Sequence, residues 1–289
     1  MNQRPDPSTF ASLLVLAAIG ALLTGCASAP ASLDTRLDRL LPADILLVGE
    51  QHDAAAHQDV ERAVVENLAA RKQLAALAIE MAEAGTDTGK LSSAATEAQV
   101  RTALRWNDDA WPWKNYAPVV MAAVKAGVPV IGANLPKARM KDAMADVSLD
   151  AQLSASAMQA QRDAIRDGHC GLLPAPQIEP MTRIQIARDR EMAHTLAEAR
   201  VAGRTVLLVS GTGHTSPALG VPQHLPTDAR VRTLGLDAGS NADSAGFDAV
   251  WATPPAPPVD HCADLRRTLR KPGQGRAGPD PIEVLRLRA

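Results

Sequence analysis

Two glycine–histidine motifs of identical spacing carry the clearest chemical signal in this sequence. Two residues separate Gly49 from His52, and Gly211 and His214 repeat the same spacing. In each motif the glycine allows the chain to turn sharply at the end of a strand. The histidine three residues later can then ligate a metal ion or act as a base. The repeat predicts that both imidazoles reach the same part of the molecule.

Two glutamates accompany these histidines. Glu50 lies inside the first motif, and Glu80 directly follows the apolar run 74–79. A carboxylate beside an imidazole raises the pKa of the imidazole and fixes its tautomer. One hypothesis is therefore a metal-dependent hydrolase, in which His52, His214 and Glu80 hold a divalent transition metal and Glu50 is the general base. The alternative is a buried polar network that ties loops to strands and binds nothing.

An aromatic segment forms the second chemical signal. Four of the seven aromatic residues of the chain lie between positions 106 and 116. Tyr116 is the only tyrosine, and tyrosinate is one of the axial ligands of haem iron. Rings such as that of Trp111 line clefts that bind flat apolar ligands. The segment predicts either such a cleft or a set of rings that packs into a core poor in aromatics.

Other polar residues give weaker signals. His57 can join the site from the first turn of the following helix, although a histidine there often only caps the helix or faces solvent. Gln185 and Arg188 share one helix face and can reach an anion such as a haem propionate. Pairing of Arg188 with a local acid such as Asp189 is the more usual role. No role is assigned to His169.

Short apolar runs alternate with helical stretches along the chain. The predicted strands are 44–48, 74–79, 128–131 and 205–210, with weaker ones at 230–234 and 247–251. The predicted helices are 54–71, 116–126, 137–166 and 179–202. This order predicts an α/β fold with a mostly parallel sheet, helices on both faces and a helical excursion at 84–104. Ligands of such folds bind at the carboxyl ends of the strands, where both motifs and both glutamates fall.

The amino terminus has the features of a lipoprotein signal peptide, assigned to residues 1–25. An apolar run at 13–23, too short to span a bilayer, leads into Leu23-Thr24-Gly25-Cys26. These four residues resemble the lipobox of bacterial lipoproteins, in which Cys26 receives the lipid. Ala27 rather than Asp follows Cys26, which favours the outer membrane. The alternative is an ordinary cleaved secretory signal with an incidental cysteine.

The remaining chain divides into three predicted parts. Residues 26–42 form a tether and a lead-in helix, 43–262 the α/β domain, and 263–289 a mobile basic tail containing proline and glycine. Export places Cys170 and Cys262 in an oxidising compartment, which favours a disulfide between them over two independent buried thiols.

Composition narrows the function classes. The 30 basic and 32 acidic residues give a formal net charge of −2. A nucleic-acid-binding protein needs an excess of basic residues to neutralise phosphates, so that class is excluded. The 46% content of hydrophobic residues excludes a disordered chain.

The motifs, taken in order, resemble the ChaN family of haem-binding lipoproteins within a wider superfamily that includes TIKI/TraB and erythromycin-esterase proteins. The segments that carry the resemblance are 47–53 with His57, 79–81, 106–116, 132–136, Gln185 with Asp189, Met192 and Ala193, 211–214, and 220–222. The resemblance covers residues 43–251 and implies a periplasm-facing, lipid-anchored haem-binding protein of iron acquisition. A homodimer that holds haem between its protomers is one arrangement that it suggests. The cofactor-binding candidates are then Tyr116, His52, His57, His214, Trp111 and Arg188, with either Tyr116 or a histidine as axial ligand. Whether the chain is also an enzyme stays open.

Overall fold

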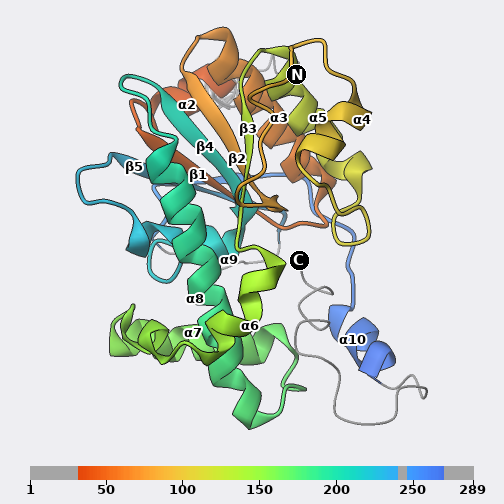
Figure 1. Ribbon diagram of the computed structural model, residues 1–289, viewed down its shortest axis with the longest axis vertical. Helices are drawn as coiled ribbons and strands as arrows, with labels where there is room; N and C mark the ends of the chain where they lie inside the picture. Colours follow the sequence, from red (N-terminus) through yellow and green to blue (C-terminus); the bar gives the residue numbers. More distant parts are fainter. Residues whose placement is uncertain (1–31, 240–245, 270–289) are drawn as a thin grey trace, which may run out of the picture. The chain divides into compact units, whose positions relative to one another are not determined.

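A computed structural model of the 289-residue chain describes residues 32–239 and 246–269. Six strands form one sheet in the order β3–β2–β4–β1–β5–β6, and each neighbouring pair is parallel (Figure 1). The strands are β1 (Ile45–Glu50), β2 (Leu74–Glu83), β3 (Val130–Asn134), β4 (Thr205–Gly211), β5 (Val231–Asp237) and β6 (Ala249–Ala252). The predicted α/β fold with a parallel sheet is confirmed.

The apolar runs predicted as strands are buried because the sheet is covered on both faces. Every residue of β1 and β4 is buried. Helices α3 (Ala55–Ala70) and α5 (Trp113–Lys125) pack on one face. The carboxyl-terminal half of α8 (Ala175–Glu198) and the short η3 (Val221–His224) pack on the other. In parallel sheets both faces are apolar, so the strands read as continuous rather than alternating apolar sequences.

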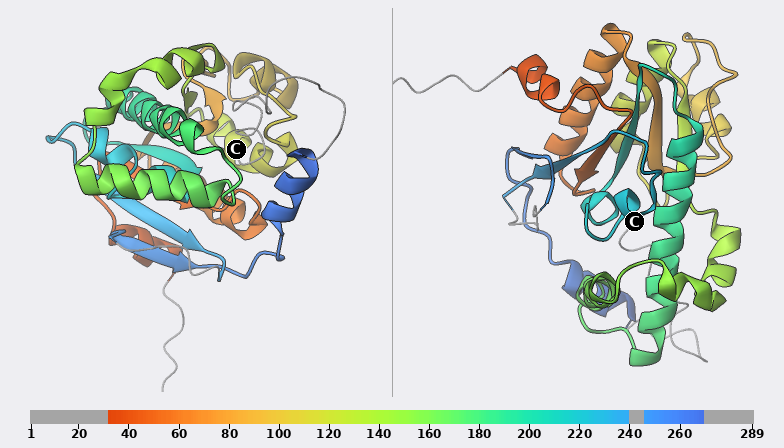
Figure 2. Two further views of the ribbon diagram at one scale, coloured as in Figure 1. Left: turned by 90° about the horizontal axis from the view of Figure 1, so that it is seen from below. Right: turned by 90° about the vertical axis from the view of Figure 1, so that its left-hand side faces the viewer.

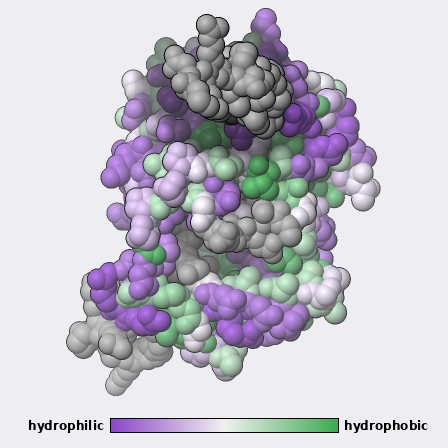
Figure 3. All heavy atoms as spheres, turned by 180° about the vertical axis from the view of Figure 1, so that it is seen from behind, coloured by the Kyte–Doolittle hydropathy of each residue, from purple (hydrophilic) through white to green (hydrophobic). Residues whose placement is uncertain are grey.

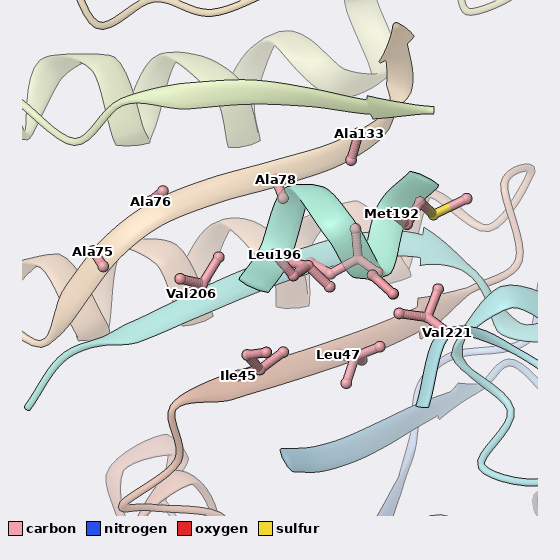
Figure 4. Close-up of a cluster of buried hydrophobic side chains, with 12 residues drawn as sticks. Ile45, Leu47, Ala75, Ala76, Ala78, Ala133, Met192, Leu196, Val206 and Val221 are labelled. Carbon is pink, nitrogen blue, oxygen red and sulfur yellow. The ribbon is translucent and has the colours of Figure 1, made fainter. Parts of the chain in front are cut away.

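The contact between α8 and the sheet shows how this packing is made. Met192 and Leu196 project from α8 onto Ile45 and Leu47 of β1 and Val206 of β4 (Figure 4). All five side chains are fully buried. Complete burial of such side chains contributes about 1.5–3 kcal/mol each, and it fixes the position of α8 over the central strands.

A helical layer lies beyond the carboxyl ends of the strands, an edge called here the carboxyl edge. It contains α6 (Lys137–Ala145), η2 (Val147–Ala151), α7 (Ala155–Gly168), the first half of α8, and α10 (His261–Leu269) (Figures 1 and 2). The single helix predicted at 137–166 is therefore wrong. Asp146 accepts a hydrogen bond from the backbone of Ser148 and starts η2, and Ser154 caps α7. These two caps divide the stretch, because each favours a new helix start over continuation.

The predicted excursion at 84–104 is helical only in α4 (Glu97–Ala103), which begins with a capping box formed by Thr96 and Gln99. The remaining described helices are α2 (Leu33–Asp38) and the four-residue α9 (Thr212–Thr215).

Among the described helices, none combines the length and hydropathy that a membrane span requires. On the face seen in Figure 3, apolar and polar side chains are intermixed.

A disulfide joins Cys170, just after α7, to Cys262 in α10, with their Cα atoms 5.8 Å apart. The predicted bridge is thus present. Residues 263–269, assigned from sequence to the tail, lie in α10. The predicted signal peptide, the lipidation site Cys26 and the rest of the tail lie outside the described residues.

Candidate functional site

The parallel register brings the motif residues together at the carboxyl edge. Glu50, the last residue of β1, pairs with Gly211, the last residue of β4. β2, which carries Glu80, borders β4 on its other side. Three chain segments more than 25 residues apart in sequence therefore deliver their polar ends to one place, as the strand ends alone predict.

Glu80 and His214 form the first half of the site. Glu80 Oε2 accepts hydrogen bonds from Ser210 Oγ at 2.7 Å and from the backbone N–H of Gly211 at 2.9 Å, and its Oε1 lies 3.3 Å from His214 Nε2. The other ring nitrogen, Nδ1, lies 2.5 Å from Asp189 Oδ1 of α8. Both nitrogens of His214 therefore face carboxylates, and the residue is buried, with 5% of its surface exposed.

Electrostatics keep this group charged. Burial lowers the pKa of His214, but the charges of Glu80 and Asp189 outweigh burial and raise this pKa to about 9. Burial by itself would raise the pKa of Glu80, yet the charge of His214 holds it well below its ordinary value. Burial raises the pKa of Asp189 to about 6, against the opposing charge of His214. At neutral pH the pair is an imidazolium and a carboxylate.

Glu50 and His52 form the second half. Glu50 Oε1 accepts hydrogen bonds from Tyr116 Oη and His52 Nδ1, both at 2.8 Å, and its Oε2 accepts one from Gln58 Nε2 at 3.1 Å. His52 Nε2 lies 3.9 Å from Glu80 Oε2, which links the two halves. Burial would lower the pKa of His52, but the hydrogen bond and charge of Glu50 raise it. The His52 side chain is 25% exposed.

Tyr116 lies buried beside Glu50. It is 2% exposed, and its hydroxyl donates to Glu50. Burial, followed by the charge of Glu50, raises its pKa above the ordinary value, so tyrosinate is disfavoured here. The geometry gives Tyr116 the role of orienting Glu50, which in turn orients His52.

The two motif glycines are required by close approach. A Cβ on Gly211 would lie 2.8 Å from His52 Nε2, and a Cβ on Gly49 would lie 2.2 Å from Thr215 Oγ1. Any side chain at Gly211 must therefore push the His52 ring away. The glycine of the second motif makes room for the histidine of the first.

The aromatic segment supports this half of the site. Trp111 contacts the His52 ring edge to face, with ring centroids 4.8 Å apart. Trp106 Nε1 donates to the carbonyl of Trp111 at 2.8 Å, and Trp113 Nε1 donates to Glu97 at 2.7 Å. The rings pack on one another and on the site. The packing alternative for this segment is therefore confirmed, and the ligand-binding cleft stays a prediction.

His57 lies away from the cleft. It is fully buried in the first turn of α3, and its Nδ1 accepts a hydrogen bond from the backbone of Gln51 at 2.9 Å. Burial lowers its pKa, so the ring is neutral. It fixes the loop that carries His52.

A cavity of about 330 Å³, called here the histidine cavity, opens between the carboxyl edge and helices α7 and α8. Five predicted residues line it: Glu50, His52, Glu80, His214 and Arg188. Arg188 is 7% exposed, and its Nε donates to Asn134 Oδ1 at 3.0 Å. The amide of Gln185 lies 3.0 Å from His214 Nδ1. Tyr116, His57 and Trp111 do not line this cavity.

Several residues of the site carry no clear sequence signal. The sequence suggests that Asp189 pairs with its neighbour Arg188, but the Asp189 carboxylate contacts His214 instead. His169 and Gln161 of the α7 region line the histidine cavity from the opposite wall. Spacing on one helix face, Gln185–Asp189, is the one signal that points to Asp189.

The structure gives the metal-ion hypothesis no support. Within residues 32–239 and 246–269, no group of three His, Cys, Asp or Glu side chains is arranged to hold a metal ion. His52, His214 and Glu80 are close, but their donor atoms face one another as ion pairs.

Comparisons with known proteins agree with the geometry. The fold is similar to a Campylobacter jejuni structure described as "Cofacial heme binding to ChaN", at 23% identity and a TM-score of 0.62, covering 72% of this chain and 87% of that one. A type III effector, HopBA1, is matched at 15% identity and a TM-score of 0.37, covering 73% and 88%. No functionally curated protein matches. A family model described as "Haem-binding uptake, Tiki superfamily, ChaN" matches residues 36–225. The chain belongs to this ChaN family of haem-binding uptake proteins.

Proposed function

We propose that this protein is a lipid-anchored haem-binding protein of iron acquisition and that haem binds in the cleft at the carboxyl edge. The observation that carries the proposal is the histidine cavity, in which a partly exposed imidazole and a buried guanidinium face the same space. Iron and propionate are the two groups of haem that these side chains recognise. Membership of the family supports haem as the ligand, and the lining of the histidine cavity supports this cavity as the binding site.

Of the predicted iron ligands, His52 fits best. Metal-ligating histidines commonly donate their second ring N–H to a carboxylate, which is the contact of His52 Nδ1 with Glu50. His52 Nε2 lies 3.9 Å from Glu80 Oε2, which is too far for a hydrogen bond, so this nitrogen is less engaged than either nitrogen of His214. Both nitrogens of His214 face carboxylates, and Tyr116 donates to Glu50. We therefore assign iron ligation to His52 and a propionate contact to Arg188.

A haem titration followed by absorption spectroscopy tests both parts of the proposal. Wild type is expected to shift the Soret band at micromolar haem, His52→Ala to lose that shift, and Tyr116→Phe to weaken it only in part. His194→Ala is the matched control, because His194 lies on α8 with a side chain that is 65% exposed and does not line the histidine cavity. No shift with wild type would refute haem binding. A normal shift in His52→Ala would refute the ligand alone.

The lipid anchor rests on the lipobox and is tested separately. Incorporation of labelled palmitate is expected in wild type and absent in Cys26→Ser, with the wild-type protein recovered in the bacterial outer-membrane fraction. The Campylobacter jejuni relative is described as binding haem cofacially, which supports a homodimer holding haem between its protomers. Light scattering with and without haem measures that association, and a monomer in both conditions would contradict it.

A further inference from the structure

A second cavity lies beside the histidine cavity and shares Glu80 and Arg188 with it. Its volume is about 120 Å³. Three cationic side chains from different parts of the chain line it: Arg105, just after α4; Lys137, at the start of α6; and Arg188 of α8. We call it the cationic pocket. Since three separate elements place a positive charge there, the convergence is a property of the fold rather than of one charged helix face.

Arg188 is the buried cation of this pocket. Its Nε donates to the neutral amide of Asn134, and within the described part of the chain no carboxylate forms an ion pair with it. Glu80, the acid nearest in the shared wall, is occupied by Ser210, Gly211 and His214. A buried charge is stable only when it is paired or hydrogen-bonded. The charges of Glu80 and Asp189 act on the guanidinium of Arg188 without an ion pair, so its terminal N–H groups can still donate to a bound anion.

The two outer cations are also without an ion pair among residues 32–239 and 246–269. Glu83 lines the pocket, but its Oε1 accepts the backbone N–H of Lys137 at 2.9 Å rather than the Lys137 ammonium. Arg105 follows the helix end with φ +48°, a left-handed position at which glycine or asparagine is preferred. This position just past the helix end directs the chain toward the pocket that the Arg105 side chain lines.

The rest of the pocket wall combines apolar side chains with the amides of Asn107 and Asn134 and the carboxylates of Glu80 and Glu83. Trp111, Leu135 and Met140 line it, and Trp111 also contacts His52 of the histidine cavity. A ligand that spans both cavities therefore meets an imidazole at one end, an apolar wall in the middle, and three cations at the other end. A planar dicarboxylate with an apolar body has this distribution of groups.

We propose that the cationic pocket is a carboxylate subsite that binds the propionates of haem, so that the protein selects tetrapyrroles with free carboxylates. This inference rests on the proposed haem binding. Arg188 forms the floor of the subsite and holds one carboxylate through its guanidinium fork. Arg105 and Lys137 hold the second carboxylate at the rim, where solvent still reaches both side chains.

The test compares haem with its dimethyl ester, in which both propionates are neutral. Affinity is measured by absorbance titration of the purified full chain. The ester is expected to bind wild type about tenfold to a hundredfold more weakly than haem, the range that loss of charge-assisted hydrogen bonds produces. An Arg105→Met/Lys137→Met double variant is expected to lose affinity for haem by about tenfold, with little effect on the ester. Lys141→Met is the matched control, since Lys141 is an exposed residue of α6 outside the pocket.

Equal affinity of wild type for haem and its ester would overturn the subsite and leave haem binding intact. Failure of wild type to bind either compound would overturn the proposed function itself. The two rim positions are exposed, so their substitution leaves the fold in place. Arg188→Met extends the series, with near-ultraviolet circular dichroism to confirm folding. An equal loss of haem affinity in Lys141→Met and the double variant would show a general charge effect and refute the assignment.

Discussion

Removal of the disulfide between Cys170 and Cys262 is expected to destabilise the protein by several kcal/mol. The two cysteines are 92 residues apart in sequence. In the chain-entropy description, closing a loop of this length removes about 4.6 kcal/mol of conformational free energy from the unfolded chain at 25 °C. The ion pair that joins α10 to the loop after β1, His261 with Asp53 at 3.1 Å, replaces little of this, because it is exposed and contributes at most about 1 kcal/mol.

The assay is urea unfolding of a Cys170→Ala/Cys262→Ala double variant against wild type, both under oxidising conditions. We expect the free energy of unfolding to fall by about 2–5 kcal/mol, since measured losses are often smaller than the entropy value. The midpoint of thermal unfolding is expected to fall by roughly 10 °C. Each single variant should match the double variant, because either substitution removes the bond. Wild type in excess dithiothreitol should approach the same value.

A double variant within 1 kcal/mol of wild type would refute this reasoning. The local consequence is measured in the same proteins. His169, one residue before Cys170, lines the histidine cavity. Hydrogen exchange in the last turn of α7 should therefore accelerate when the bond is absent, whereas exchange in β1 and β4 should follow only the change in global stability.

Three further predictions concern the cleft. Gly211→Ala places a methyl group 2.8 Å from His52 Nε2, and because such overpacking costs about 1–3 kcal/mol, haem affinity is expected to fall by about tenfold. Gly213→Ala, whose Cβ meets nothing within 4 Å, should keep wild-type affinity in the same titration. Between pH 7 and 10 the free energy of unfolding is expected to fall by about 3 kcal/mol. The raised pKa of His214, about 9, gives stability that is complete below the unfolded value and lost as pH rises through 9. Urea unfolding at both pH values measures this, and a His214→Gln variant with the same pH dependence would contradict the assignment. Glu80→Gln leaves the buried imidazolium of His214 with one carboxylate fewer and is expected to lose about 3–5 kcal/mol; a loss below 1 kcal/mol would show that the pair is not coupled.

The part of the site that stands on strand ends was predictable from the sequence. Glu50, Glu80 and Gly211 each close a short apolar run. Parallel strands present their carboxyl ends at one edge, so these positions were expected at the same edge, and they come into contact because β4 lies between β1 and β2. His52 and His214 follow at fixed spacing, which is why the two motifs and both glutamates were found together.

Contacts that depend on the placement of helices were not predictable. Asp189 faces His214 because α8 packs over β1 and β4 with one particular rotation, and no local pattern states that rotation. Tyr116 is a single residue on α5, and its hydroxyl donates to Glu50 only because α5 lies against the first strands. The break at Asp146 within the predicted helix 137–166 depends on one side-chain cap, which competes narrowly with helix continuation.

The partners of the acids explain why the cleft favours an anionic ligand although acids and bases are nearly balanced in it. Glu50 accepts hydrogen bonds from Tyr116, His52 and Gln58, so its charge is directed into the protein. The charge of Glu80 is directed inward in the same way, toward Ser210, Gly211 and His214. Arg188 hydrogen-bonds to a neutral amide, that of Asn134, while the charges of Glu80 and Asp189 act on it without forming an ion pair. A ligand entering the cleft therefore meets carboxylate oxygens that already accept hydrogen bonds and a guanidinium that can still donate them. A low local dielectric strengthens a hydrogen bond between that guanidinium and an anion, so an anion gains more on binding than a neutral molecule of the same shape.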